Sequence, residues 1–285
     1  MNSKNELYSN LKPFLNCKDF TVSEESYKVM RNQEFEMLVT TPIPKNLEKY
    51  YKSEAYISHT DAKKTLLDKV YQIVRNYTLQ KKLQLINSFN SEQKTLLDIG
   101  AGTGDFLATC LQNNWKVFGV EPNLEARNIA KEKNVFLQEK IDFFTEKKFD
   151  VITLWHVLEH VENLEEYIHK LKNLLNENGT LVIAVPNFKS YDATYYKEFW
   201  AAFDVPRHLW HFSQNSIHKL FSKVSMAVVK TIPMKFDAYY VSLLSEKYKK
   251  GKMNVFTSFW IGFLSNLKAR QSSEYSSLIY VLKNK

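Results

Sequence analysis

Short apolar runs alternate with stretches of helical periodicity along the chain from residue 91 onward. The apolar runs predict strands at 95–99, 116–120, 135–138, 149–154, 180–185, 226–232 and 278–282. Apolar positions at helical spacing predict helices at 105–113, 124–133, 164–175 and 214–223. Strands that alternate with helices join through right-handed crossovers into a parallel sheet that is covered on both faces. We therefore expect an α/β fold with a doubly wound, mostly parallel sheet of seven strands.

The chain before this region has a different pattern. Residues 1–60 contain several prolines and short polar stretches, which predict an irregular lead-in with one short hairpin around 20–39. Residues 61–90 carry apolar side chains at helical spacing and predict a helix that packs on the core, so we expect an N-terminal helical extension after the irregular lead-in. The core would then span 91–285, with a loop at 188–213 and a helical insertion at 245–270 before the last strand.

One predicted helix has clear end signals. Asn163 is followed three residues later by Glu166, which resembles a capping box with Asn in place of Ser or Thr. Gly179 ends the segment after Leu175.

The strongest local motif joins the first core strand to its helix. Asp98 and Ile99 end the strand, and Gly100, Gly102 and Gly104 follow at alternate positions. Glycine lets the chain turn sharply and lets a ligand approach the backbone, and the next helix offers the positive end of its dipole. The next predicted strand ends in Glu121, whose carboxylate is suited to the two hydroxyls of a ribose. Together these features predict a nucleoside site; the alternative for Glu121 is a surface carboxylate before Pro122.

The glycine spacing separates two kinds of nucleoside site. Dinucleotide-binding folds use G-x-G-x-x-G around a pyrophosphate, whereas this loop reads G-x-G-x-G. The loop resembles motif I of the class I S-adenosylmethionine-dependent methyltransferases. Three later segments, 149–161, 179–187 and 204–213, resemble the branch that includes the ubiquinone-biosynthesis O-methyltransferases. The resemblance covers about 95–225 and implies a Rossmann-like fold; a nicotinamide oxidoreductase remains the alternative for the cofactor.

The resemblance also implies an activity and a cofactor site. The activity is methyl transfer from S-adenosylmethionine to a small-molecule acceptor, at oxygen. A lipid-like acceptor and a non-catalytic protein that binds an adenosyl ligand remain alternatives. The residues implied to contact the cofactor are Asp98, Gly100, Ala101, Gly102, Gly104, Glu121, Pro122, Trp155 and His156. The residue that would contact the adenine after the third strand has no clear match.

Methyl transfer from a sulfonium needs alignment and exclusion of water, and a base where the acceptor is a hydroxyl. His208 and His211 are the candidate bases, with Asp204 as an orienting carboxylate. The alternative is that both histidines brace the loop. Arg207 has two interpretations as well, an anion-binding residue or a partner of Asp204. Aromatic side chains are candidates for the acceptor pocket wall or for core packing: Trp200, Phe203, Trp210 and Phe212. Candidate lid residues, or plain surface tyrosines, are Tyr50, Tyr51 and Tyr56.

No metal site is predicted. His156, Glu159 and His160 are close in sequence, but the adjacent Glu159 and His160 would diverge on a regular element. Cys17 and Cys110 lie far apart, so neither a disulfide framework nor a zinc pair is expected.

Composition adds expectations about partners and location. The formal net charge of +8 is spread along the chain, which predicts a basic surface and makes nucleic acid an unlikely partner. The chain has no signal-peptide pattern and no long apolar run, so we expect a cytoplasmic protein. The stretch 247–267 combines lysines with aromatics; a packed core or lid helix is favoured, and peripheral membrane contact is the alternative. The sequence predicts neither the acceptor nor the oligomeric state.

Overall fold

The computed structural model describes residues 6–51, 66–89, 91 and 93–285, with the backbone alone for 66–71. No helix in these ranges has the length and apolar character needed to cross a bilayer.

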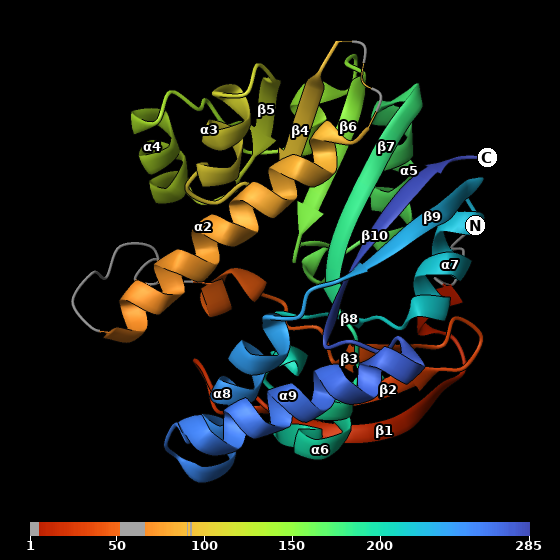
Figure 1. The fold of residues 1–285 in the computed structure, drawn as a ribbon. Coiled ribbons are helices and arrows are strands. Elements are labelled where there is room, and N and C mark those ends of the chain that lie inside the picture. Colours follow the sequence, from red (N-terminus) through yellow and green to blue (C-terminus); the bar gives the residue numbers. More distant parts are fainter. Residues whose placement is uncertain (1–5, 52–65, 90, 92) are drawn as a thin grey trace.

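The main sheet has six strands in the order β5-β4-β6-β7-β10-β9 (Figure 1). Its strands are β4 (Thr95–Ile99), β5 (Lys116–Val120), β6 (Phe149–Trp155), β7 (Leu175–Pro186), β9 (Met226–Pro233) and β10 (Ser277–Asn284). Neighbouring strands are parallel from β5 to β7, and β10 is antiparallel to both β7 and β9. The expected doubly wound, mostly parallel α/β sheet is thereby confirmed.

The expected count of seven strands is wrong. The segment 135–138, predicted as a strand, forms a single parallel bridge between Gln138 and Val120. Gln138 accepts from the Glu121 amide at 2.9 Å and donates to the Gly119 carbonyl at 2.9 Å. Phe136 in the same segment is exposed. Only Gln138 of this segment pairs with β5, so β5 is the edge strand of the main sheet.

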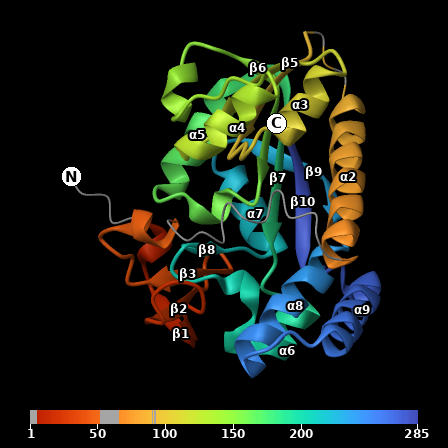
Figure 2. The same cartoon turned by 90° about the vertical axis from the view of Figure 1, so that its left-hand side faces the viewer.

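Helices cover both faces of the main sheet (Figure 2). The helices are α2 (Leu66–Asn87), α3 (Asp105–Leu111), α4 (Leu124–Glu132), α5 (Leu164–Leu174) and α7 (Gln214–Ser222). Leu96 belongs to a buried cluster that includes side chains of α2, α3 and α4, whereas its neighbour Leu97 belongs to a separate cluster that includes side chains of α5 and α7. Successive strand residues point to opposite faces, so apolar side chains on both faces require a cover on each. Asn163 makes no capping bond with its side chain, so the expected capping box at α5 is wrong.

The N-terminal region forms a second sheet where an irregular lead-in was expected. Its antiparallel order is β1-β2-β3-β8, and the strands are β1 (Leu11–Lys18), β2 (Ser26–Asn32), β3 (Met37–Thr41) and β8 (Trp210–His211). The expected hairpin around 20–39 corresponds to β2 and β3, and the expected helix at 61–90 corresponds to α2. Short turns preceding β8 are η1 (Glu6–Tyr8), η2 (Leu47–Tyr51), η3 (Ile141–Phe144), η4 (Leu158–His160), η5 (Lys197–Phe199) and η6 (Ala201–Phe203). The fourth strand comes from the predicted 188–213 loop. Pairing across about 170 residues carries no local signal, which is why sequence reasoning missed the pairing of β3 with β8.

Three further helices complete the fold on the side where the parallel strands end: α6 (Tyr191–Tyr196), α8 (Asp237–Lys250) and α9 (Val255–Ser272). Figure 1 shows them, together with β1–β3, beneath the carboxyl ends of β4, β6 and β7. Asp192 is fully buried there and accepts hydrogen bonds from Trp200, Ser265 and Ser276 at 2.6–2.7 Å. This carboxylate ties α6, α9 and β10 into one body.

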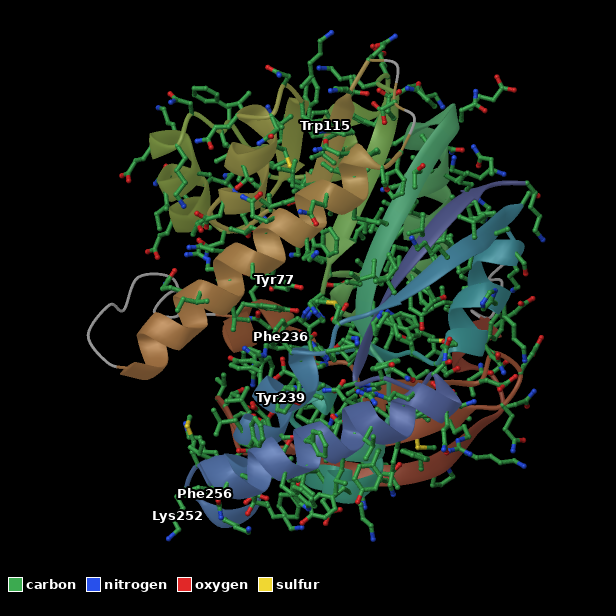
Figure 3. The ribbon with its side chains drawn as sticks, in the orientation of Figure 1. Tyr77, Trp115, Phe236, Tyr239, Lys252 and Phe256 are labelled. Carbon is green, nitrogen blue, oxygen red and sulfur yellow. The ribbon has the colours of Figure 1, made fainter. Side chains whose placement is uncertain are left out.

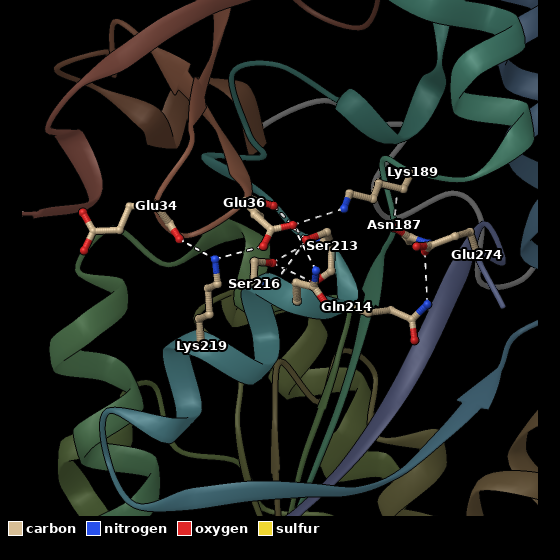
Figure 4. Close-up of polar contacts among 10 residues, drawn as sticks. Glu34, Glu36, Asn187, Lys189, Ser213, Gln214, Ser216, Lys219 and Glu274 are labelled. Atoms are coloured by element: carbon tan, nitrogen blue, oxygen red, sulfur yellow. Dashed lines mark hydrogen bonds and ion pairs between the residues drawn. The ribbon is translucent and has the colours of Figure 1, made fainter. Parts of the chain in front are cut away.

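Polar contacts fasten the N-terminal sheet to the core (Figure 4). Glu36, before β3, forms ion pairs with Lys189 at 3.4 Å and Lys219 at 2.9 Å. The Ser213 hydroxyl donates to the Glu36 carbonyl at 2.7 Å. Hydrogen bonds from Asn215 and Lys219 lower the pKa of Glu36 to about 2, so its carboxylate is charged at neutral pH.

Candidate active site

The glycine loop lies at the carboxyl end of β4 and is fixed by its neighbour β5. The amides of Gly100 and Ala101 donate to the Val120 carbonyl at 2.8 and 3.0 Å, and the Gly104 amide donates to the Ala101 carbonyl at 3.0 Å. These donors are therefore used within the protein. If the loop surrounds a ligand as expected, these three amides do not donate to it, and the loop contributes a close approach of its backbone instead.

Two glycines of the loop have different surroundings. Both have positive φ, +70° at Gly100 and +53° at Gly102. A Cβ at Gly100 would lie 2.4 Å from Val157 Cγ2, so this glycine is needed for packing. A Cβ at Gly102 would meet no heavy atom of the described residues within 4 Å. Gly102 thus leaves open space at the position where a ligand would approach the backbone.

Glu121 is buried and joins the loop to the end of β5. Its Oε2 accepts from the Gly102 amide at 2.9 Å, and its Oε1 accepts from the Asn123 amide at 2.9 Å. Burial raises the pKa of Glu121, and these two amides oppose that rise. The surface-carboxylate alternative is therefore excluded. Each carboxylate oxygen keeps a second lone pair for a ligand hydroxyl.

The start of α3 already holds a carboxylate. Asp105 lies in its first turn, forms an ion pair with Arg75, and accepts from Lys133 at 2.9 Å. Asp105 thus already occupies the positive end of the helix dipole and is paired with two cations, so a pyrophosphate bound there would compete with this carboxylate. The start of α3 therefore fits a dinucleotide poorly.

Asp98 and Trp155 lie on adjacent strands behind the loop. Burial raises the pKa of Asp98 to about 7, although the Thr153 hydroxyl donates to it at 2.5 Å. The Lys82 ammonium lies 4.2 Å from the centre of the Trp155 ring, and burial lowers the pKa of Lys82 to about 8. Trp155 Nε1 is buried and donates to none of the described residues. An unpaired buried donor costs free energy, which a ligand acceptor would recover only if it reached this nitrogen.

His156 sits at the tip of β6 in a left-handed conformation, with φ at +57°. Its Nε2 lies 3.2 Å from Asp237 at the start of α8, and its Nδ1 lies 3.5 Å from Glu159. Burial would lower the pKa of His156, but the contacts with Asp237 and Glu159 raise it to about 10. Both ring nitrogens therefore face carboxylates. This arrangement makes His156 a charged link between β6 and α8. The expected contact of His156 with the cofactor stays a prediction.

The raised pKa of His156 predicts a loss of stability at alkaline pH. A group whose pKa is raised on folding stabilises fully below its unfolded pKa of about 6.5, and this stabilisation disappears as the pH passes the folded value. The melting temperature should therefore fall between neutral pH and about pH 10. In Asp237→Asn the melting temperature should fall less between neutral pH and about pH 10, as measured by thermal unfolding across that range. An equal fall of the melting temperature in both proteins would contradict the link between His156 and Asp237.

His208 and Asp204 are brought together, as the sequence predicted. His208 Nε2 lies 3.7 Å from an Asp204 oxygen, and its Nδ1 lies 2.9 Å from the Ala202 carbonyl. Because a carbonyl only accepts, Nδ1 carries a proton and Nε2 holds the lone pair when the ring is neutral. Arg207 donates to Asp204 at 2.6 Å. This contact favours the interpretation of Arg207 as a partner of Asp204 over that of an anion-binding residue.

His211 is buried on β8 and points elsewhere. The Thr40 hydroxyl donates to the His208 carbonyl at 2.7 Å, so its oxygen accepts from His211 Nε2 at 2.9 Å. Burial, together with the charge of His208, lowers the pKa of His211 to about 3. This geometry favours the bracing interpretation, in which neutral His211 joins β3 to β8.

Glu159, His160 and His208 form a group that the sequence did not predict. One potential ligand atom from each lies within 4.8 Å of the others. The group differs from the set of His156, Glu159 and His160 considered from the sequence, because His156 turns to Asp237. Burial and the charge of His208 lower the pKa of His160 to about 4, and its Nδ1 lies 3.1 Å from the Tyr51 hydroxyl. The histidines converge because the turn after β6 packs against the 204–211 segment.

The aromatic side chains expected around an acceptor belong to the core. Each of the four is at most 3% exposed: Trp200, Phe203, Trp210 and Phe212. The indole groups of Trp200 and Trp210 donate to Asp192 and to the Val161 carbonyl. Tyr50 is buried and bonded to Tyr27 and Glu25, which excludes the surface interpretation for it. Tyr56 lies outside the described residues, and Pro122 is exposed beside Glu121.

Comparisons with known proteins identify the family of the chain. A family model described as a methyltransferase domain matches residues 71–231, more than half of the chain. A ubiquinone biosynthesis O-methyltransferase of Rickettsia felis is 30% identical over 152 residues, 50% of this chain and 61% of that protein. An uncharacterized methyltransferase of Alkaliphilus oremlandii is 33% identical over 108 residues, 35% of this chain and 50% of that protein. The chain thus spans about half to three fifths of these relatives.

Solved structures with the same fold include two methyltransferases with bound S-adenosylhomocysteine. The magnesium protoporphyrin IX methyltransferase of Synechocystis has a TM-score of 0.55 at 15% identity, covering 82% of this chain and 97% of that one. A coclaurine N-methyltransferase has a TM-score of 0.51 at 15% identity, covering 79% and 76%. Family match and shared fold lead to one conclusion: the chain belongs to the methyltransferase domain family.

Proposed function

We propose that the protein transfers the methyl group of S-adenosylmethionine to an oxygen of a small-molecule acceptor. The observation that carries the cofactor assignment is the buried Glu121 carboxylate beside the open space at Gly102. Glu121 would hold the ribose hydroxyls, and Asp98 would orient the loop or reach the amino group of the methionine end. The cofactor supplies an activated methyl group, so the remaining task of the chain is alignment and, for a hydroxyl acceptor, removal of a proton.

His208 is the base that the geometry favours. Its Nδ1 is held by the Ala202 carbonyl, which leaves Nε2 as the acceptor of a proton. Asp204 at 3.7 Å from Nε2, and the buried Glu159 in the same group, would stabilise the imidazolium that forms. Glu159 is charged throughout the neutral range: burial opposes ionisation, but His156 and His208 lower its pKa to about 2. The relatives named O-methyltransferases support oxygen as the acceptor atom.

A labelled-methyl assay with a panel of phenols, carboxylic acids and amines tests this proposal. His208→Gln removes the base while keeping an amide able to donate to Ala202, and the rate on a hydroxyl acceptor should fall by about 10²- to 10⁴-fold. The dissociation constant for S-adenosylmethionine, measured by calorimetry, should stay unchanged. Mass spectrometry of the product identifies the methylated atom.

His211→Gln is the matched control. It removes a buried histidine of the same segment and should lower the stability by about 1–3 kcal/mol while keeping the pH dependence of the rate. Full activity of His208→Gln would remove His208 as the base. Methylation of amines alone would remove oxygen as the acceptor, and tight cofactor binding with no product from the panel would favour the non-catalytic alternative.

A further inference from the structure

Helix α9 is built with its apolar face outward. Its large side chains occur at helical spacing on one face and are exposed: Phe256, Phe259, Trp260, Phe263 and Leu267. Phe256 is 91% exposed. The opposite face, which packs on α6 and α8, consists mainly of small residues: Ser258, Ile261, Gly262, Ser265 and Ala269. The sequence interpretation of α9 as a packed core or lid helix is therefore wrong for its aromatic side chains.

The aromatic face of α9 continues onto α8. Tyr239 packs against Phe259 with ring centres 5.2 Å apart, and Trp260 stacks on Phe263 at 5.8 Å. Phe236 and Tyr240 of α8 are exposed as well. Figure 3 shows Phe256 and Lys252 at the far end of the α8–α9 hairpin, with Tyr239 and Phe236 along α8. Contiguous exposed aromatic surface of this extent is typical of an interaction site.

The same hairpin is strongly basic. Residues 247–273 contain six cationic side chains and no Asp or Glu: Lys247, Lys249, Lys250, Lys252, Lys268 and Arg270. All six residues are exposed. The four lysines cluster at the end of α8 and in the turn before α9, next to Phe256. Aromatic side chains beside lysines are the combination by which helices lie in the interface of anionic bilayers.

We propose that the α8–α9 hairpin docks this protein on an anionic membrane surface, with the aromatic face of α9 inserted between lipid headgroups. A twofold dimer through this face is disfavoured, because such an interface brings the same patch of each copy together and would oppose two basic patches. Within the part of the chain that the structure describes, Lys250 alone of the six cations pairs with a carboxylate, Glu246 at 2.8 Å. An anionic lipid surface accommodates the aromatic rings and the cations together. The hairpin also reaches the site, since α8 begins at Asp237, the partner of His156.

Vesicle flotation tests the proposal with the full chain. The protein should float with vesicles of phosphatidylcholine mixed with phosphatidylglycerol, float poorly with phosphatidylcholine alone, and lose binding as salt is raised. The double substitution Phe256→Ser with Trp260→Ser should lower vesicle binding at least about tenfold. Both side chains are exposed, so the folded structure should be kept, as circular dichroism would check.

The matched control is Phe136→Ser with Phe143→Ser, which removes two exposed aromatics far from the hairpin, 70% and 65% exposed. It should bind vesicles as the wild type does. A second readout is quenching of tryptophan fluorescence by brominated lipid, which should disappear in Trp260→Phe while flotation persists. No flotation of the wild type, or equal flotation of the Phe256/Trp260 variant, would overturn the proposal. The proposal would also be overturned if light scattering showed that the wild type is a dimer, that the Phe256/Trp260 variant is a monomer, and that neither protein binds vesicles.

Discussion

Replacing Glu121 with Ala is expected to weaken binding of S-adenosylmethionine by about 1–3 kcal/mol, the range for leaving buried polar groups unpaired. Glu121 accepts from the Gly102 and Asn123 amides, so the substitution removes a ligand for the ribose and also a support of the loop. Calorimetric titration with S-adenosylmethionine and S-adenosylhomocysteine measures the effect. The two ligands should lose similar affinity, because both carry the ribose.

The control for this substitution lies four residues further on. Glu125→Ala removes the same charge from the exposed first turn of α4 and should leave the affinity within about 0.5 kcal/mol of wild type. Glu121→Gln should fall between the two, since its amide can accept one of the two hydrogen bonds. Binding of NAD by the wild type in place of the adenosyl ligands would contradict the cofactor assignment, and unchanged affinity in Glu121→Ala would contradict the role of the carboxylate.

The position of the candidate cofactor residues was predictable because its signals are local. Asp98, the glycines and Glu121 lie at or near the ends of two neighbouring strands, and parallel strands bring their carboxyl ends to one edge. Their contacts with the cofactor stay a prediction that comes from the family resemblance.

The remainder depends on contacts between distant segments. Asp237 lies 81 residues after His156, and nothing in either segment indicates that they meet. His160 and His208 converge through the packing of two loops, with ring centres 4.5 Å apart. The expectation that the stretch 247–267 packs as a core or lid helix was wrong for the aromatic side chains of α9 for a different reason. An aromatic face predicts burial in a soluble core, and the small residues Gly262, Ser265 and Ala269 are the signal that would have reversed it.

Two glycines of one loop should respond differently to the same substitution. Asparagine tolerates the left-handed conformation that both glycines adopt. Gly100→Asn and Gly102→Asn therefore differ in the space around the new side chain and not in backbone strain. At Gly100 the new Cβ would approach Val157, whose β-branched side chain has little rotamer freedom, and we expect a destabilisation of about 3 kcal/mol. At Gly102 the side chain enters open space, so stability should change by less than about 1 kcal/mol.

The effect on binding should have the opposite order to the effect on stability. If the space at Gly102 belongs to the cofactor, Gly102→Asn fills it and should weaken S-adenosylmethionine binding at least about tenfold, or 1.4 kcal/mol, in a protein that remains folded. Chemical denaturation and calorimetry on the same preparations separate the two quantities. Wild-type affinity in Gly102→Asn would mean that the ligand approaches another part of the loop. A stable Gly100→Asn would mean that Val157 can move, since the backbone conformation is shared by both positions.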